Sequence, residues 1–458
     1  MKILPKLSAT QSIAAAFTAL ILIGTFLLML PISSSSGTVT NFFDALFVST
    51  SAVTVTGLTP LDTAVHWSTT GHIFLALLVQ IGGFGIIGFA TLVGYLLEGK
   101  ISLKSRISVF AESSATKQPD AKTLLKNIGK MMIFFQVILF IILAFRFYTE
   151  YGYSLGKALS HGGFHSLMTF NQAGFALYSD SMIGFAKDPL IILSVFIFGT
   201  LASFGFPVLA EIRDRFKLKV MLRMGKQASY QMPVQWSLNS RIVLWASLVL
   251  LVVGALGVAV AEWSNPATLG ALDPFQKVMT SLFTSSMTRS TGLNSIDTGA
   301  MDSGTWIGMN MLMFIGGASA STAGGIKIGT AVILFYIVLT EIRGDAAVNV
   351  GNRRLPRSMQ RQALTILTIY SLVIIGALLL LRFTTKFGTD ELLFEIISAA
   401  GTVGLSTGIT ADLPDHAKFL LSLLMLFGRL GPIVVATSLA LRKTKRHFEY
   451  PRESPLIG

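Results

Sequence analysis

The chain contains no cysteine, and only 13% of its 458 residues are charged. The absence of cysteine excludes disulfide bonds and thiolate metal sites. A soluble protein usually carries about 25% charged residues, so the low charge content argues against a surface that faces water throughout. With 52% hydrophobic residues and a mean hydropathy of +0.67, the composition indicates an integral membrane protein.

Long apolar runs recur along the chain, and the clearest of them, residues 242–261, has no charged side chain. A helix that spans a membrane needs about 20 such residues. An even number of spans places both termini on the same side of the membrane. We predict eight spans, at residues 12–31, 72–97, 130–149, 188–210, 241–263, 304–341, 362–383 and 416–441.

The net charge of +13 is concentrated between the spans. The N-terminus together with residues 100–130, 213–241, 343–361 and 442–452 holds 26 of the 36 lysines and arginines. Basic connections that alternate with less basic ones are the positive-inside pattern. The pattern places these connections and both termini in the cytoplasm. It accounts for the basic charge without a nucleic-acid partner.

Each external connection combines a short amphipathic stretch with a segment rich in glycine, threonine and serine. The four segments share a glycine, at Gly57, Gly174, Gly292 and Gly404, with separations of 117, 118 and 112 residues. Such a recurrence indicates an internal repeat. We predict an all-α polytopic membrane protein with four pseudo-symmetric helix–pore-loop–helix repeats around one central pore, as in potassium channels. The predicted units are residues 1–99, 100–212, 213–345 and 346–441, followed by a cytoplasmic tail at 442–458.

The short amphipathic stretches fit half-helices that enter the membrane without crossing it. Non-helical backbone at membrane depth must be buried in protein or line a water-filled cavity. Its free carbonyl groups can replace the hydration shell of a potassium ion, and glycine lets them approach without a Cβ atom. We therefore predict an ion-binding filter formed by Val55, Thr56, Gly57, Ala173, Gly174, Thr291, Gly292, Val403 and Gly404.

Within this filter, we expect potassium to bind to the carbonyl oxygens of Thr56, Gly174, Gly292 and Gly404. The sequence from Thr402 to Leu405, Thr-Val-Gly-Leu, is close to the Thr-Val-Gly-Tyr-Gly filter of tetrameric potassium channels. Two of the other loops depart from it, which predicts a single ring of ligands and weaker discrimination between potassium and sodium. Further oxygens are expected from the hydroxyl groups of Thr56, Thr291 and Thr402.

The sixth predicted span is too long, at 38 residues where about 20 suffice. Its middle consists almost entirely of small residues, so we expect a break in the helix on the cytoplasmic side of the filter. The alternative without a functional role is a packing kink in the helix, with the Lys327 side chain extended to the membrane interface. We predict a gate formed by Gly316, Gly317, Ala318, Ser319, Ala320, Ser321, Thr322, Ala323, Gly324 and Gly325, with Lys327 and with Arg429 of the last span.

Several other signals have less specific explanations. The G-x-G-x-x-G sequence at residues 83–88 lies within an apolar span with no preceding strand, so helix packing explains it better than dinucleotide binding. His161 and His165 have the spacing of metal ligands but lack a third ligand, and Arg289 is expected to point away from the pore axis. Acidic residues near the outer ends either concentrate cations or cap helices; they are Asp44, Asp273, Asp390, Glu391 and Glu395.

The four loops, the glycine-rich break and the Gly-Arg-Leu-Gly sequence at 428–431 together resemble the Ktr/Trk/HKT superfamily of potassium transporters. The resemblance covers nearly the whole chain and is strongest to the Ktr-type membrane subunit, because the first loop follows the first span directly. It implies a homodimer in the bacterial inner membrane, associated with a cytosolic nucleotide-binding ring of regulatory subunits. It also implies potassium uptake that sodium often aids, with any nucleotide bound only by the regulatory partner.

Two other functions remain open at this point. A cation symporter with alternating access would show inverted repeats, whereas these loops all enter from the same side. An intramembrane enzyme would need a nucleophile with a base, or a set of metal ligands, within the spans. The spans offer serine and threonine without such a set, so we predict no catalytic residue and no enzymatic activity.

Overall fold

The computed structural model describes residues 9–85, 88, 91, 121–225 and 235–431, and most of them are helical. The strands found in this part of the chain form one antiparallel hairpin, β1 (Asn349–Val350) with β2 (Arg353–Arg354). Four of the described helices are long and apolar enough to cross a membrane. They are α1 (Ala9–Met29), α7 (Ala121–Thr149), α11 (Leu238–Glu262) and α15 (Arg357–Thr384). The chain is therefore a helical, polytopic membrane protein, as the sequence predicts.

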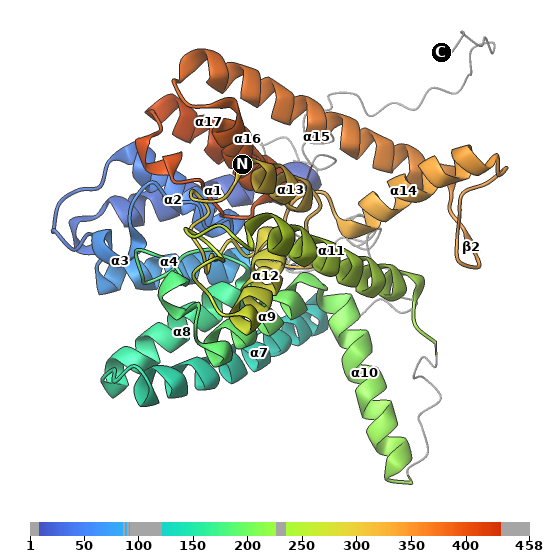
Figure 1. Cartoon of the computed structure of the whole chain (residues 1–458), viewed down its shortest axis with the longest axis horizontal. Coiled ribbons are helices and arrows are strands. Elements are labelled where there is room, and N and C mark those ends of the chain that lie inside the picture. Colours follow the sequence, from blue (N-terminus) through green and yellow to red (C-terminus); the bar gives the residue numbers. More distant parts are fainter. Residues whose placement is uncertain (1–8, 86–87, 89–90, 92–120, 226–234, 432–458) are drawn as a thin grey trace, which may run out of the picture.

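Each of these four helices is followed by a shorter helix that packs against it; Figure 1 shows this pairing for α7 and α8. The C-terminal halves of the short helices are buried almost completely, which places the ends of these helices in the interior of the protein. The short helices are α2 (Phe42–Thr54), α8 (Leu155–Asn171), α12 (Pro274–Thr288) and α16 (Thr389–Gly401).

A further helix follows each short one after a connecting segment that is mostly non-helical, so the same order of main helices recurs four times. The four are α4 (Thr69–Gly82), α9 (Pro189–Ser203), α13 (Ser303–Phe314) and α17 (Asp415–Leu430). The connections before and after the short helices also contain one short α-helix, α3 (Thr63–His66), and three short 3₁₀ helices, η1 (Pro31–Ser33), η2 (Ile183–Phe185) and η3 (Ile409–Asp412).

Two of the predicted spans are interrupted. Helix α9 continues into α10 (Phe206–Arg223) through a bend of 105°, and α10 extends away from the bundle (Figure 1). The expected break in the sixth span lies between α13 and α14 (Ile328–Arg343). Predicted spans 72–97 and 416–441 extend into residues outside the described ranges. Most of the 100–130 connection and the whole 442–458 tail also lie outside these ranges. The count of eight spans therefore stays a prediction.

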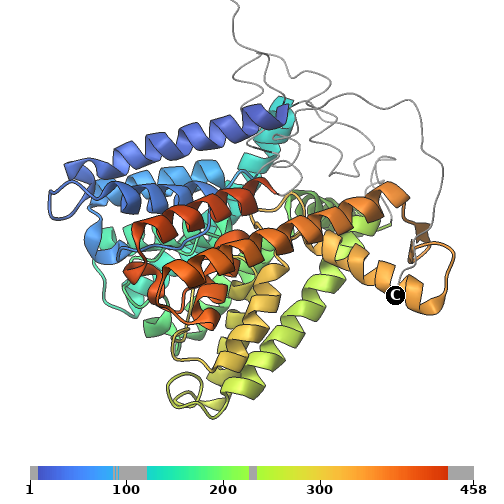
Figure 2. The same ribbon diagram turned by 90° about the horizontal axis from the view of Figure 1, so that it is seen from above.

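Contacts between distant parts of the chain close the bundle. Helix α17 of the last unit packs against α2 of the first, and the Lys418 ammonium lies 2.7 Å from the Asp44 carboxylate. The β-hairpin segment packs against apolar residues of α14 through Val348, Val350 and Leu355. Figures 1 and 2 place this hairpin at one extremity of the molecule, beside the junction of α14 and α15.

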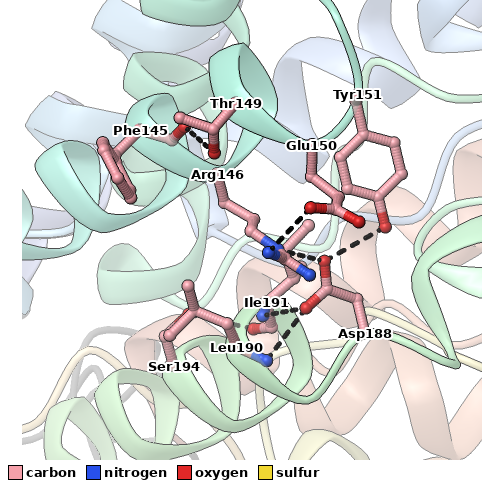
Figure 3. A network of polar contacts seen from close by, with 9 residues as sticks. All are labelled: Phe145, Arg146, Thr149, Glu150, Tyr151, Asp188, Leu190, Ile191 and Ser194. Atoms are coloured by element: carbon pink, nitrogen blue, oxygen red, sulfur yellow. Dashed lines mark hydrogen bonds and ion pairs between the residues drawn. The ribbon is translucent and has the colours of Figure 1, made fainter.

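A buried carboxylate joins α7 to α9 (Figure 3). Asp188 accepts hydrogen bonds from Arg146 Nε at 2.7 Å and from the Tyr151 hydroxyl at 3.2 Å. Its second oxygen accepts from the backbone N–H groups of Leu190 and Ile191, which begin α9. Burial and the neighbouring Asp188 raise the pKa of Tyr151 to about 12, so this tyrosine stays a neutral donor at physiological pH.

Replacing Asp188 with asparagine should loosen this junction. The amide can still cap α9, but it removes the buried carboxylate partner of Arg146 and leaves the guanidinium only the more exposed Glu150 carboxylate. Losing one member of a largely buried pair is costly. We expect the thermal unfolding midpoint in detergent, followed by tryptophan fluorescence, to fall by a few degrees. Asp214→Asn breaks the exposed pair with Arg213 and serves as the control, with a shift of less than about 1 °C. Equal shifts in the two variants would contradict the assignment.

Candidate functional site

The four glycines singled out by their spacing form a closed ring. A methyl group built on Gly57 would lie 2.2 Å from the backbone nitrogen of Gly174, and one on Gly174 would lie 3.0 Å from the carbonyl oxygen of Gly292. A methyl group on Gly292 would lie 2.8 Å from the Cα atom of Gly404, and one on Gly404 would lie 3.3 Å from that of Gly57. Each loop thus abuts the next, in chain order.

Carbonyl oxygens of the preceding residues lie at these contacts. The methyl group on Gly404 would meet the Thr56 oxygen at 2.2 Å, and the one on Gly292 would meet the Val403 oxygen at 2.1 Å. Gly57, Gly292 and Gly404 also have φ angles of +93°, +70° and +101°. The contacts require glycine because a Cβ atom would collide with a neighbouring loop. The positive φ angles favour glycine because residues with a Cβ atom rarely adopt them.

The short helices end in a conformation that turns the chain sharply into the ring. The residues that end α2, α8 and α16 are Val55, Gln172 and Thr402, with φ angles of 59°, 63° and 48°. Left-handed backbone is unfavourable for β-branched residues such as valine and threonine, so the surrounding packing must hold it in place. Helix α12 departs from this pattern, since Arg289 ends it at φ −80°.

Serine side chains support two of the four loops. The Gly57 N–H donates to Ser51 Oγ at 2.9 Å, and the Gly404 N–H donates to Ser398 Oγ at 3.2 Å. In both cases the serine lies six residues before the glycine. The Thr56 hydroxyl, which we expected to add an oxygen to the filter, is hydrogen-bonded to the Thr54 hydroxyl at 2.8 Å.

A cavity of about 290 Å³ lies on one side of the ring. Residues that follow the ring glycines in each loop line it, including Thr59, Tyr178, Asn294 and Ser406, and Asp62 is the one charged residue among them. We refer to this cavity as the vestibule.

The acidic residues expected near the outer ends do not line the vestibule. Asp44 is paired with Lys418, and Glu391 accepts a hydrogen bond from the Gly388 N–H at the start of α16. For Glu391 the geometry therefore favours helix capping over cation attraction, and for Asp44 it favours an ion pair.

The segment between α13 and α14, residues 315–327, lies against the opposite side of the ring. A methyl group on Gly324 would lie 2.0 Å from the Thr402 hydroxyl oxygen, and the Thr322 hydroxyl donates to Gln172 Oε1 at 2.9 Å. Thr402 and Gln172 each precede a ring glycine by two residues. The vestibule and the 315–327 segment therefore face the ring from its two sides.

The two cations predicted beside this segment have different roles in the structure. Arg429 is almost fully buried and donates one hydrogen bond to the Thr322 carbonyl and one to the Gly82 carbonyl at the end of α4. Lys327 folds back and donates to the Ala323 carbonyl at 2.6 Å, within its own segment. Arg429 thus ties the segment to the first unit, while Lys327 shapes the segment itself.

Backbone hydrogen bonds fix the segment further. The Ala318 N–H donates to the Ser203 carbonyl, and the Phe206 N–H donates to the Ala320 carbonyl. These bonds attach the segment to the bend between α9 and α10. The segment therefore contacts the bend between α9 and α10 and, through Arg429, is linked to the ends of α17 and α4.

Gln172 connects the ring to this segment, and the sequence analysis missed it. Its Nε2 donates to the Gly199 carbonyl, and its Oε1 accepts from the Ser290 and Thr322 hydroxyls. The residue belongs to no motif. The signal that could have revealed it is an amide side chain at a position where the other three loops carry valine, serine and threonine.

The remaining predicted residues are placed as follows. The Arg289 guanidinium donates to the Ser247 carbonyl of α11 at 3.4 Å, so its side chain turns toward an outer helix. His165 Nε2 accepts from the Leu177 N–H and His161 Nδ1 lies 3.0 Å from the Tyr178 hydroxyl, which gives both rings partners within the protein. In the described residues, no group of three or more acidic, histidine or cysteine side chains could hold a metal ion.

Comparison with known proteins identifies the family. The family model named TrkH, described as cation transport protein, matches residues 6–448. The chain belongs to the TrkH family of cation transport proteins. Its fold agrees with the crystal structure of the potassium transporter TrkH from Vibrio parahaemolyticus, at a TM-score of 0.68 and 19% identity over 93% of this chain and 85% of that one.

Curated TrkH-family relatives match along almost their entire length. The Ktr system potassium uptake protein B of Vibrio alginolyticus is 33% identical over 97% of this chain and 94% of its own length. The Ktr system potassium uptake protein D of Bacillus subtilis is 33% identical, covering 100% and 99%. The potassium/sodium uptake protein NtpJ of Enterococcus hirae is 32% identical, covering 99% and 98%.

Replacing Gln172 with leucine should release the 315–327 segment. The change leaves three buried polar groups without their partner, each at a cost of about 1–3 kcal/mol. We expect the amides of residues 315–327 to exchange with deuterium faster in mass spectrometry. Gln360→Leu, which removes a hydrogen bond to the Leu355 carbonyl just before α15, should leave their exchange unchanged. Unaltered protection of the segment in the Gln172 variant would show that the amide does not hold it.

Proposed function

We propose that this TrkH-family chain takes up potassium across the bacterial plasma membrane, with the glycine ring as its selectivity filter. The observation that carries the proposal is the closed ring itself, in which backbone carbonyls from four loops meet between an outer vestibule and an inner segment. The names of three similar proteins, which describe potassium or potassium/sodium uptake, support the choice of ion.

The chemistry of such a ring suits a dehydrated monovalent cation. Carbonyl oxygens of Thr56, Gly174, Gly292 and Gly404 replace the water molecules around the ion. The C-terminal ends of the four short helices carry partial negative charge toward the same region. Because the vestibule has a single acidic lining residue, the backbone and the helix ends supply most of the attraction to the ion.

The 315–327 segment acts as the gate in this proposal. It packs directly beneath the ring, consists mostly of small residues, and is fastened by the buried Arg429. Its contacts with three other units allow a shift of any of them to displace it. Lys327 contributes by holding the C-terminal part of the segment in shape.

The wider assembly follows from the resemblance and from the names of the relatives. We propose eight spans in four pseudo-symmetric repeats, with both termini in the cytoplasm, and a homodimer that binds a cytosolic nucleotide-binding regulatory ring. The term Ktr system in the names of relatives agrees with a membrane component that works with a regulatory partner. Sodium as a coupled ion is supported by the name of the Enterococcus hirae relative. We propose no enzymatic activity.

The filter assignment predicts that Gly404→Ala abolishes uptake. The new Cβ atom would overlap the Thr56 carbonyl at 2.2 Å, far inside the optimal contact distance. We expect rubidium uptake into proteoliposomes to fall by more than about tenfold. Gly376→Ala is the control, because nothing lies within 4 Å of a methyl group at that position in α15.

A second readout separates loss of the filter from loss of folding. Wild-type protein should unfold at a higher temperature in potassium than in a large organic cation, because a bound ligand stabilises the folded state. The Gly404 variant should lose this difference. Wild-type uptake by the Gly404 variant would end the filter assignment, and wild-type flux as slow as a carrier cycle would favour alternating access.

The gate assignment predicts that Arg429→Met raises uptake. The substitution keeps the side chain's bulk but removes its hydrogen bonds to the Thr322 and Gly82 carbonyls. We expect the rate without a regulatory partner to rise by about three- to tenfold, the effect of one or two lost hydrogen bonds. Arg429→Lys should give an intermediate rate. Arg382→Met, at an exposed position of α15, is the control, and an unchanged rate in folded Arg429→Met would refute the gate.

A further inference from the structure

Two of the four short helices carry a buried polar side chain at the same position. His165 in α8 and Glu395 in α16 each lie nine residues before their ring glycine, and both are 0% exposed. Neither side chain reaches the ring itself. Each instead accepts a hydrogen bond from the backbone N–H three residues after the glycine, on the outer limb of the same loop.

In the fourth loop the carboxylate of Glu395 accepts three hydrogen bonds. The Thr407 N–H donates at 3.1 Å, the Ser406 hydroxyl donates to the same oxygen, and the Thr410 hydroxyl donates to the other oxygen at 2.9 Å. These donors span the outer limb from its second to its sixth residue beyond Gly404. Glu395, which the sequence predicts to attract cations or cap a helix, is instead buried and bonded to its own loop.

In the second loop the imidazole of His165 accepts a single hydrogen bond from the outer limb. Its Nδ1 lies 2.8 Å from the His161 carbonyl, which fixes the proton on that nitrogen and leaves Nε2 as an acceptor. The Leu177 N–H donates to Nε2 at 3.2 Å. The ring stacks against Tyr178 at 5.0 Å, so the imidazole is held in this orientation.

The other two loops have no polar side chain at the matching helix position. In the first loop the residue three after the glycine is Pro60, which has no N–H to satisfy, and the matching helix position is Val48. In the third loop the matching helix position is Phe283. There the outer limb is held through the backbone of Asn294, whose N–H donates to Ser181 Oγ and whose carbonyl accepts from Met182.

We propose that His165 and Glu395 are positioning residues that hold the outer limbs of the second and fourth loops and thereby set the width of the ring. Gly174 and Gly404 are alternate members of the ring, so the two clamps act along one of its diagonals. A shift of either limb would move carbonyl oxygens toward or away from the ion. Selectivity between ions of different radius depends on that distance and on how firmly it is held.

The inference rests on the ring acting as the filter, and the test uses the ratio of rubidium to sodium uptake in proteoliposomes. His165→Leu and Glu395→Leu remove the acceptors, and we expect the ratio to fall by about three- to tenfold, the effect of a lost buried hydrogen bond. His165→Gln and Glu395→Gln retain an acceptor oxygen and should stay within about twofold of wild type.

Val48→Ala is the matched control, because it truncates the corresponding position of α2, where no clamp exists. It should lower the thermal unfolding midpoint and leave the uptake ratio unchanged. Should Glu395→Leu fail to fold, Thr410→Val tests the same clamp from the loop side and should lower the ratio by about twofold.

The outcomes separate the inference from the proposed function. An unchanged ratio in the folded leucine variants, or an equal loss in Val48→Ala, would overturn the positioning role. If Gly404→Ala abolishes uptake while the leucine variants keep the ratio, only the clamps are refuted. If Gly404→Ala transports normally with the wild-type ratio, the filter assignment fails, and the positioning role of His165 and Glu395 fails with it.

Discussion

The structure depends on the need to satisfy backbone polar groups at membrane depth without water. Four short helices end inside the protein, and the carbonyls beyond them cannot continue a helix. The chain meets this need by bringing the four ends together, so that each glycine abuts the next loop. The same arrangement leaves carbonyl oxygens around a common region, where a cation can take the place of the missing donors.

The surrounding side chains hold this unusual backbone rather than bind an ion. Ser51 and Ser398 accept from the ring glycines, while His165 and Glu395 accept from the outer limbs. On the inner side, Gln172 links the second loop to the 315–327 segment. Strained backbone of this kind persists only where the surrounding structure holds it in place. These buried hydrogen bonds hold the loop backbone in its left-handed conformation.

The 315–327 segment satisfies the same constraint differently. Its backbone lies at membrane depth without helical hydrogen bonds, and it borrows partners from Ser203, Phe206 and the guanidinium of Arg429. The partners of the segment therefore lie in other helices, and its position depends on theirs. Its small residues allow close packing beneath the ring.

The sequence by itself determined the membrane environment, the glycine ring and the helix break, because hydropathy, a regular spacing and a run of small residues are local properties of the chain. It also indicated that Arg429 contacts the 315–327 segment, since a charge within a span demands a partner. Only the tertiary structure decided which side chains hold the loops. Gln172, His165 and Glu395 act on backbone groups brought to them by folding, and nothing local in the sequence distinguishes a buried carboxylate that clamps a loop from an exposed one that attracts cations.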